Sequence, residues 1–432
     1  MAASRTPTPQ APPYDVIVIG GGPAGSTVGA LLAMKKRRVL VLEKSRHPRF
    51  HIGESLLPRN VPIFRKLGVL DQVRAIGVEK KGADFSVPGC KNHTVFDFSR
   101  ALDPDEPSAF QVTRSAFDKI LLDNTRDKGA EVRERTEVLD FRIAPDRVAV
   151  TVKDLEEDDG TRELSARYLI DASGRDTFIG GKLGLKTRDP RHNSAAVFNH
   201  FSGVPVRGGE EAGNISIYWF EHGWFWMIPL GPDRMSVGMV SAPEFLKTRD
   251  GSLEDFLLGA FSLCPNVRKR MENARPLEET RAAGNFSYRS RRIFGERFIM
   301  VGDAYTFIDP VFSSGVFIAM RSAEYAADAI DACLGDPANA PRLLARYQRH
   351  VDRGISGFSW FIYRFMHPAM RFLFMNPSRR FGLQAAVISV LSGDVYGRTR
   401  LWPRLALFRA TFAAVRLLNG LGVSLPLGRK TR

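Results

Sequence analysis

Apolar residues near the start of the chain form two short runs, separated by a glycine-rich turn and a stretch of small residues. Asp15–Gly20 is apolar and rich in β-branched residues, which predicts a buried strand, and Arg38–Leu42 predicts a second one. Between them, Ser26–Met34 has the small and apolar residues of a helix that packs on a sheet. Residues 1–13 are rich in Pro, Thr and Ser and lack the apolar core of a signal peptide, so we expect a flexible tail.

Later apolar runs extend the same pattern and then change it. Leu164–Gly174 and Arg297–Asp303 each predict a strand with a small-residue end, and Ala109–Thr125 predicts a short strand followed by a helix. A further helix of small and apolar residues is expected from Ser313 to about residue 333. Residues 193–242 instead alternate polar and apolar positions in several short runs, which is typical of an antiparallel sheet. We therefore expect an α/β fold in which an antiparallel sheet is inserted into a Rossmann-like domain.

The turn after the first strand carries glycines at G-x-G-x-x-G spacing. Gly20 permits the tight turn, Gly22 lets the backbone approach a pyrophosphate, and Gly25 lets the helix pack closely on the strand. A pyrophosphate is expected at the helix N-terminus, where free N–H groups and the helix dipole favour an anion. Glu43, 23 residues after the first glycine, can accept ribose hydroxyls. The motif predicts a dinucleotide site without choosing between FAD and NAD, and the sequence has no second motif for a separate nicotinamide domain.

Polar groups in later segments can contact a bound dinucleotide. Arg114 stands at the predicted strand–helix junction, from which it can reach phosphate or ribose, although a surface arginine at a helix start is the simpler alternative. Asp171, Ser173 and Gly174 end one predicted strand, and their backbone can lie close to an adenosine group. Gly302-Asp303 ends another strand and places a carboxylate near the sugar chain of a cofactor. The helix N-terminus at Ser314 forms a second anion site.

Two pairs of side chains are ambiguous when judged from the residues alone. Trp224 and Trp226 lie two apart in a predicted strand and so face the same side, as core residues or a pocket wall would. Lys80 and Lys81 are adjacent, and most such pairs are solvated surface charge.

The basic character of the chain is concentrated in its last fifth. The formal net charge is +15, and residues 341–432 contain 16 Lys and Arg but only 2 Asp and Glu, so the rest of the chain has a net charge of only +1. Arginines interrupt aromatic and aliphatic runs here, and the longest uncharged run, Phe381–Gly393, is shorter than the roughly 20 residues that span a bilayer. These features fit helices packed on the body with solvated arginines, a membrane-surface contact, or a docking face for an acidic partner. No nucleic-acid-binding motif accompanies the charge, so we expect no nucleic acid partner.

The three cysteines, Cys90, Cys264 and Cys333, lie far apart and are odd in number. They form neither a disulfide framework nor a metal-binding spacing, so we expect no metal and a reducing cytoplasmic location.

Taken together, these segments resemble the flavin-dependent halogenases, a branch of the FAD monooxygenase-like fold, over roughly residues 14–418. The glycine motif is shared by many flavoproteins. More specifically, Trp224-Phe225-Trp226-Met227-Ile228-Pro229 matches the family's W-x-W-x-I-P, and Phe307-x-x-Pro310-x-x-Ser313-x-Gly315 matches its F-x-x-P-x-x-S-x-G. Lys80-Lys81-Gly82-Ala83 supplies the K-x-G-A context of the family's essential lysine, with Lys80 in the lysine position and Lys81 as the alternative.

The resemblance implies a Rossmann-like FAD-binding domain of the glutathione reductase/p-hydroxybenzoate hydroxylase type, an inserted antiparallel β-sheet substrate domain and a C-terminal helical segment. On this basis we expect the FAD-binding domain to comprise residues 14–85, 108–178 and 285–340. The substrate domain would comprise residues 86–107 and 179–284, and a basic, mostly helical segment residues 341–432.

The resemblance also implies a mechanism. Reduced FAD and O2 convert chloride or bromide into hypohalous acid, and the catalytic residue Lys80 passes electrophilic halogen to an electron-rich substrate. Lysine suits this role because its pKa shifts readily on burial. Trp224 and Trp226 keep substrate away from the flavin, and Ser313, Ser314 and Gly315 bind the halide. The expected cofactor-binding residues are Gly20, Gly22, Pro23, Ala24, Gly25, Glu43, Lys44, Gly53, Glu54, Ser55, Arg114, Asp171, Gly174, Gly302, Asp303, Pro310, Gly315 and Val316.

One departure from the family indicates the kind of substrate. Halogenases that act on free tryptophan carry a glutamate directly before the Ser-x-Gly of the second signature, where this chain has Phe312. The chain therefore looks more like the branch that halogenates phenols, pyrroles or alkyl positions, often on a carrier protein. The expected partners are a separate flavin reductase and, at the basic C-terminal segment, an acidic carrier protein or a membrane surface.

Two alternatives share the fold. The chain could be an FAD-dependent reductase or monooxygenase that acts on a hydrophobic, isoprenoid-like substrate at a membrane surface. The tryptophans would then be a pocket wall and the lysines surface charge. It could also be a flavoprotein or carrier-binding module without activity. Bromide-dependent product formation separates the first alternative from a halogenase.

Overall fold

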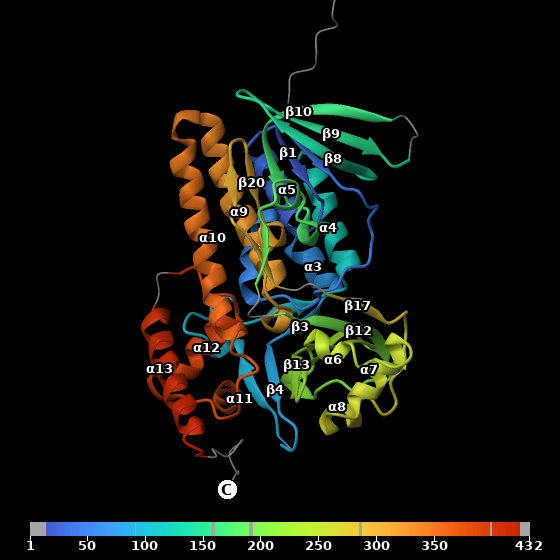
Figure 1. Ribbon diagram of the computed structural model, residues 1–432, viewed down its shortest axis with the longest axis vertical. Helices are drawn as coiled ribbons and strands as arrows, with labels where there is room; N and C mark the ends of the chain where they lie inside the picture. Colours follow the sequence, from blue (N-terminus) through green and yellow to red (C-terminus); the bar gives the residue numbers. More distant parts are fainter. Residues whose placement is uncertain are drawn as a thin grey trace, which may run out of the picture.

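A computed structural model describes residues 14–90, 92–156, 160–189, 193–284, 287–397 and 400–423 (Figure 1). The expected N-terminal tail, residues 1–13, lies outside the described residues. The described chain forms two large sheets, and helices from the last part of the chain lie beside the second one.

The first sheet is centred on β1 (Tyr14–Ile19), the apolar run that precedes the glycine motif. β1 is parallel to β2 (Val39–Leu42) on one side and to β10 (Thr161–Asp171) on the other. This sheet contains the strands predicted at Asp15–Gly20, Arg38–Leu42, Leu164–Gly174 and Arg297–Asp303, because a strand buried on both faces is apolar throughout. The short strand predicted at Ala109 lies in a separate two-stranded sheet. The strand order is β19-β20-β10-β1-β2-β7; β9 also pairs with β10, and β8 pairs with β9. The remaining strands are β7 (Glu131–Arg133), β8 (Thr136–Ile143), β9 (Val148–Asp154), β19 (Phe294–Gly295) and β20 (Phe298–Met300).

Three helices pack together against this sheet. α1 (Pro23–Met34) contacts both α4 (Arg114–Asp127) and α9 (Ser314–Gly335). Small residues allow this close approach: a Cβ added at Gly29 of α1 would lie 2.9 Å from a methyl carbon of Val41 in β2. The shorter helices α2 (Val61–Leu67), α3 (Leu70–Ile76) and α5 (Phe178–Lys182) complete this domain.

The second sheet is largely antiparallel, as the alternating pattern of residues 193–242 predicts. Its order is β16-β12-β15-β14-β13-β4-β5, with β17 also paired to β12. Helices α6 (Pro243–Leu246), α7 (Leu253–Phe261) and α8 (Pro265–Arg270) follow β15. The strands are β4 (Gly82–Ser86), β5 (Thr94–Asp97), β12 (Ala195–Ser202), β13 (Ile215–Phe220), β14 (Gly223–Gly231), β15 (Arg234–Ser241), β16 (Arg275–Pro276) and β17 (Arg281–Ala283).

One expected boundary differs from the structure. We expected the FAD-binding domain to extend to residue 85, but β4 already belongs to the second sheet, where it runs parallel to β13. A five-residue strand is too short for its own pattern to indicate which sheet it joins, and the pairing with β13 decides it. Two small sheets link the domains, one formed by β3 (Val78–Lys80) and β6 (Ala109–Gln111), the other by β11 (Lys186–Arg188), β18 (Tyr288–Ser290) and β21 (Thr306–Phe307).

The C-terminal segment is helical and packs into the core, as the simplest of its three interpretations predicts. α10 (Ala340–Ile362) lies beside α9 and leads to α11 (Pro368–Met375), α12 (Leu383–Leu391) and α13 (Leu401–Gly420), which gather next to β4 (Figure 1). Buried Phe358, Phe361 and Phe374 share one hydrophobic cluster with Phe85 of β4 and Phe96 of β5. In the described part of the chain, no helix has the length and apolar character needed to cross a membrane.

Candidate functional site

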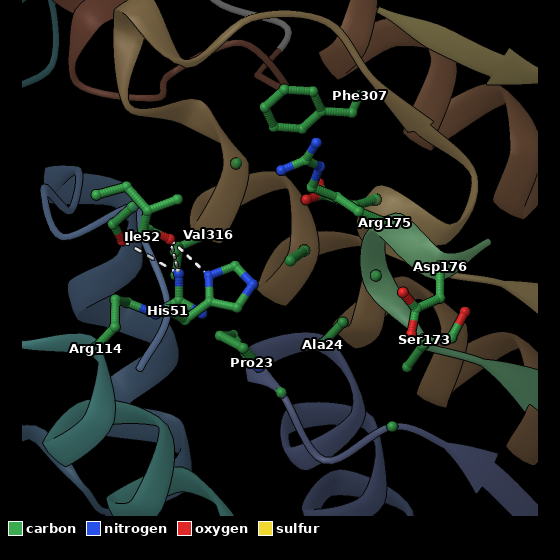
Figure 2. A pocket seen from close by; sticks show the side chains of 18 of the residues that line it. Pro23, Ala24, His51, Ile52, Arg114, Ser173, Arg175, Asp176, Phe307 and Val316 are labelled. Carbon is green, nitrogen blue, oxygen red and sulfur yellow. Dashed lines mark hydrogen bonds between the residues drawn. The ribbon is translucent and has the colours of Figure 1, made fainter. Parts of the chain in front are cut away.

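A cavity of about 630 Å³ lies between the two sheets, at the carboxyl ends of β1, β2 and β10. Its wall draws residues from the glycine-rich turn, from the loop after β2 and from the start of α9 (Figure 2). Trp224, Trp226 and Ile228 of β14 also line it. Most of the predicted site residues line it: Gly20, Gly22, Pro23, Ala24, Glu43, Lys44, Gly53, Glu54, Ser55, Arg114, Gly174, Trp224, Trp226, Asp303, Pro310, Ser313, Gly315 and Val316.

The three glycines of the motif have different local environments. Gly20 has a φ of +97°, and a Cβ there would lie 2.5 Å from the carbonyl oxygen of Ala172. A Cβ at Gly25 would lie 1.8 Å from the carbonyl oxygen of Gly20, so Gly25 is required for the helix to approach the turn. At Gly22, by contrast, the nearest atom is Nη2 of Arg49 at 3.6 Å, which leaves open space at the N-terminus of α1. This open cradle fits the pyrophosphate of the expected FAD.

Glu43 is buried and holds the glycine-rich turn in place. Its Oε2 accepts a hydrogen bond of 2.7 Å from the backbone N–H of Gly21, and its Oε1 accepts one of 2.8 Å from Ser45 N–H. Arg49 approaches Oε1 at 4.0 Å. Glu43 therefore lies at the predicted place beside the cavity and also fixes the shape of the cradle.

Arg114, at the first turn of α4, fastens the loop after β2 to the helix. Its guanidinium donates two hydrogen bonds, of 2.8 and 3.0 Å, to the carboxylate of Asp118, and a third of 2.8 Å to the carbonyl oxygen of Ile52. The nearby positive charge of Arg114, together with burial, lowers the pKa of His51 to about 4, so this imidazole at the cavity wall is neutral near pH 7.

Five predicted residues do not line the cavity: Gly25, Lys80, Asp171, Gly302 and Ser314. Asp171 is fully buried and its two carboxylate oxygens accept hydrogen bonds from the backbone N–H groups of Ser173 and Ile179. Burial raises the pKa of Asp171, and these bonds partly oppose the rise. The side chain of Asp171 thus fixes the adjoining turn. That the backbone of this turn lies close to the adenosine of the cofactor stays a prediction.

Asp303 lines the cavity near two arginines. Burial raises the pKa of Asp303 to about 6, against the opposing charges of Arg175 and Arg114. Arg175, whose guanidinium lies by the Phe307 ring at 5.9 Å, was not predicted from the sequence (Figure 2). Its only sequence signal was its place directly after Gly174.

The start of α9, where we expect an anion to bind, lies partly at the cavity wall. Ser313, the residue before the helix, adopts a left-handed conformation with φ +54° and lines the cavity together with Gly315 and Val316. The first N–H groups of this 22-residue helix have no intrahelical acceptor and face an anion favourably. Asp309 supports the approach to the helix, since its Oδ1 accepts a hydrogen bond from Val311 N–H and its Oδ2 one from the Ser194 hydroxyl.

Trp224 and Trp226 form one buried wall of the cavity. Both side chains point from β14 to the same side of the sheet, with ring centroids 6.0 Å apart. Nε1 of Trp226 donates a hydrogen bond of 3.1 Å to the hydroxyl of Ser236 on β15, which fixes the ring. The pair lies where the sequence pattern predicts a pocket wall.

Lys80 and Lys81 are in opposite environments. Lys80 is only 1% exposed, and its Nζ donates hydrogen bonds of 2.8 Å to the Ser55 hydroxyl and 3.0 Å to the Leu56 carbonyl oxygen. Burial lowers the pKa of Lys80 to about 7. Lys81 is exposed and paired with Glu210. Lys80 does not itself line the cavity, but Ser55 does, so the amine lies one hydrogen bond behind the wall.

Sequence reasoning missed several residues that the fold brings to the cavity. They belong to loops, to a short helical turn and to the start of α5, none of which carries a recognisable motif, and the tertiary structure brings them together. Among the described residues, no group of three or more His, Cys, Asp and Glu side chains is arranged to hold a metal. The missed residues are Arg49, Phe50, His51, Arg175, Asp176 and Phe178.

Comparisons with known proteins agree with this geometry. The FAD binding domain family matches residues 13–354. The chain is 30% identical, over 415 residues, to the 1H-pyrrole-2-carbonyl peptidyl-carrier-protein chlorinase of Pseudomonas fluorescens. The alignment covers 90% of this chain and 91% of that enzyme. Among solved structures, the myxobacterial chondrochloren halogenase has a TM-score of 0.78 at 32% identity, covering 95% of this chain and 90% of that one. A flavoprotein/dehydrogenase from Cytophaga hutchinsonii has a TM-score of 0.86 at 27% identity, covering 94% and 99%.

Proposed function

We propose, from the premise that this chain belongs to the flavin-dependent halogenases, that it transfers electrophilic halogen through Lys80 to an electron-rich substrate held on a carrier protein. The observation that supports this proposal most directly is the buried Lys80 amine, one hydrogen bond from the cavity wall at Ser55. Lys81, exposed and ion-paired, lacks any such access.

When bound, reduced FAD would supply two of the four electrons that reduce O2, and chloride or bromide would supply the other two as it is oxidised to hypohalous acid. The chain's residues prepare the site for this chemistry. The open cradle at Gly22 receives the pyrophosphate, and the N–H groups at Ser313–Gly315 attract the halide. Trp224 and Trp226 close one side of the cavity and keep the organic substrate away from the flavin.

Lys80 suits a halogen relay because its amine is desolvated and titrates near neutral pH. A pKa of about 7 leaves a large neutral fraction, with a lone pair that can accept electrophilic halogen. The neutral amine can equally hold hypohalous acid by a hydrogen bond. An ordinary exposed lysine would be almost entirely protonated at this pH.

The proposed substrate class rests on Phe312 and on the C-terminal segment. Phe312 is buried against Phe365 and Phe361, with ring centroids 5.6 and 6.2 Å apart, so this position offers an apolar wall and no carboxylate. The similar Pseudomonas fluorescens enzyme is named for a pyrrole carried on a peptidyl carrier protein. The net positive charge of residues 341–432 suits an acidic carrier. The proposal also includes a separate flavin reductase, because the sequence has no second dinucleotide motif.

The test is an assay with FAD, a generic flavin reductase, O2 and bromide. Substrates are free phenols, indoles and pyrroles, and pyrrole-2-carbonyl groups loaded on an acidic carrier protein, with products read by mass spectrometry. Brominated product that is lost in Lys80→Ala and retained in the matched control Lys81→Ala supports the proposal. Hydroxylated or reduced products independent of bromide would instead favour the reductase or monooxygenase alternative.

A further inference from the structure

A buried acid–histidine pair, Glu54 and His200, adjoins the cavity. Beyond the expected contact of Glu54 with the cofactor, the proposed function gives this pair no role. Glu54 lines the cavity with a side chain only 1% exposed. Its Oε1 lies 2.6 Å from Nε2 of His200. Among the described residues, Oε2 of Glu54 has no hydrogen-bond partner. A buried carboxylate oxygen without a partner is costly, so this atom is available to a group inside the cavity.

His200 connects this pair to the surface. It lies on β12 two residues after Phe198, on the face of the sheet that carries the tryptophans. Its Nδ1 is 3.2 Å from Oε1 of Glu278 and 3.2 Å from Nη1 of Arg234, and Nη1 of Arg234 also donates to Glu278 at 3.0 Å. The side chain of His200 is 3% exposed, that of Glu278 28% and that of Arg234 41%. The contacts therefore run from the cavity to solvent.

This arrangement lets His200 gain and lose a proton. Nδ1 faces both an acceptor, the Glu278 carboxylate, and a donor, the Arg234 guanidinium, so it keeps a partner in either protonation state. Burial lowers the pKa of His200, but the hydrogen bond and charge of Glu54, and then those of Glu278, outweigh it, and the pKa is raised. The other charge nearby, Arg281, lies over the Phe50 ring, which separates it from the imidazole.

Halogenation needs a proton. In the overall balance, neutral reduced flavin, O2, a halide ion, the substrate C–H and one proton give oxidised flavin, the carbon–halogen product and two waters. The flavin and the halide each lose two electrons, and O2 gains four. A protein group at the cavity wall can deliver this proton directly to the reacting groups in each turnover.

We propose that His200 supplies this proton to the cavity through Glu54 and is recharged from solvent by way of Glu278; this inference rests on the proposed function. The N–H bond at Nε2 breaks and an O–H bond forms at Glu54 Oε1, and rotation of the carboxyl group presents the proton to the cavity. The proton ends in one of the two waters. A half-turn of the imidazole then returns an N–H to Glu54, and the vacated nitrogen takes up a proton at the Glu278 side.

The first experiment uses the ligand-free protein. The imidazole of His200 is titrated by NMR in the wild type and in Glu54→Gln, with assignment from the signal lost in His200→Gln. Because the Glu54 carboxylate raises the pKa of His200, the midpoint falls in Glu54→Gln. An unchanged midpoint would overturn the proposal, since the two groups would then not share a proton. FAD affinity, measured by flavin fluorescence, is expected to be retained in His200→Gln.

The second experiment compares the pH profiles of brominated product formation. His200→Gln and Glu54→Gln each lose on the order of a hundredfold in rate. In wild-type enzyme the rate of brominated product formation should decrease with rising pH as His200 gives up its proton. Both variants should lack this decrease. His222→Gln, which changes an exposed histidine in the turn between β13 and β14 of the same sheet, keeps the wild-type profile. A wild-type profile in Glu54→Gln and His200→Gln contradicts the proposal. If wild-type protein forms no brominated product, the proposed function fails, and the ligand-free titration alone decides whether the pair shares a proton.

Discussion

At the scale of single residues, Lys80 and Lys81 show that the tertiary environment determines whether a lysine side chain is buried or exposed. The two side chains are neighbours in sequence, yet only one is buried, because they point to opposite sides of the chain. The family signature led to Lys80, whereas the residue pattern by itself predicted surface charge. No local pattern could have indicated the burial, since it depends on Ser55 and Leu56 from a separate loop.

The pH dependence of halogen transfer should report the protonation of Lys80. The amine accepts halogen only when neutral, and its pKa is about 7, so the rate of product formation should rise as the pH rises through about 7. The rate should fall as the pH rises through the pKa of His200, which the hydrogen bond and charge of Glu54 hold above its ordinary value. Initial rates of brominated product between pH 5.5 and 10 test this expectation. A flat profile on the acid side would contradict the assignment of Lys80.

Burial of Lys80 should also appear in the stability of the protein. The unfolded chain binds a proton at this lysine up to its ordinary pKa of 10.5, whereas the folded chain releases it above about 7. Between these values the free energy of unfolding therefore rises with pH, by about 1.4 kcal/mol per unit for this group. Lys80→Met should remove that contribution, and urea unfolding of both proteins from pH 6 to 10 measures it. An identical pH dependence in the two proteins would show that the lysine is solvated.

The motif glycines allow a matched pair of substitutions. Gly22→Val should leave the fold intact, because the space there is open, and should abolish FAD binding, because the side chain enters the place of the pyrophosphate. Gly25→Val should lower the melting temperature even without FAD, because its Cβ would overlap the Gly20 carbonyl. Flavin fluorescence and thermal unfolding separate the two effects. Normal FAD binding by Gly22→Val would mean that the cofactor site is misplaced.

At the scale of elements, α4 holds the loop that covers the cavity. The Arg114–Asp118 pair spans one turn of this helix and is almost fully buried, so each charge depends on the other. The sequence predicted the strand–helix junction at Arg114 correctly, because the spacing of apolar residues changes from that of a strand to that of a helix there. It could not predict that Arg114 turns towards Asp118 and the Ile52 carbonyl, since those contacts arise only when the loop folds back.

Asp118→Ala should destabilise the protein by about 3–5 kcal/mol, because it leaves the buried Arg114 charge unpaired. The control is Lys119→Ala in the same helix, which removes an exposed pair with Asp123 and should cost less than about 0.5 kcal/mol. Urea unfolding at neutral pH measures both. Equal effects of the two substitutions would contradict the importance of the buried pair.

Strands were predictable where an apolar run is long and buried on both faces of the sheet. Short strands were less predictable. The apolar runs of β1, β2, β10 and β20 identified the first sheet. The five residues of β4 were divided between two expected domains, because their membership depends on β13, more than 120 residues later in the chain.

At the scale of the whole molecule, the C-terminal helices are part of the fold and cover the side of the second sheet near Phe312. Phe365 of the turn after α10 stacks on Trp219 of β13 with ring centroids 4.5 Å apart, and Phe374 of α11 lies 4.9 Å from Phe85. Charge and composition indicated a helical segment, but the sequence left open whether it packs on the body, contacts a membrane or binds a partner. Its core packing depends on contacts between distant segments.

A chain that ends at residue 340 should therefore fail to fold into a stable protein, since it would expose this aromatic cluster to water. Its solubility, its unfolding transition and its FAD binding, each compared with the full chain, test the expectation. A soluble fragment with a cooperative transition and bound FAD would show that the helices are an independent unit.

The division of the chain around Ala319 has an evolutionary consequence. Every residue that lines the cavity lies at or before this position in the described chain, while the aromatic wall behind Phe312 is supplied by residues after 340. The cavity wall and the aromatic packing behind Phe312 are thus encoded in successive stretches of one gene. Recombination downstream of α9 would exchange this packing and leave every lining residue of the cavity in place, so a chimaera joined there folds only if its new helices match the aromatic core around Phe85 and Trp219.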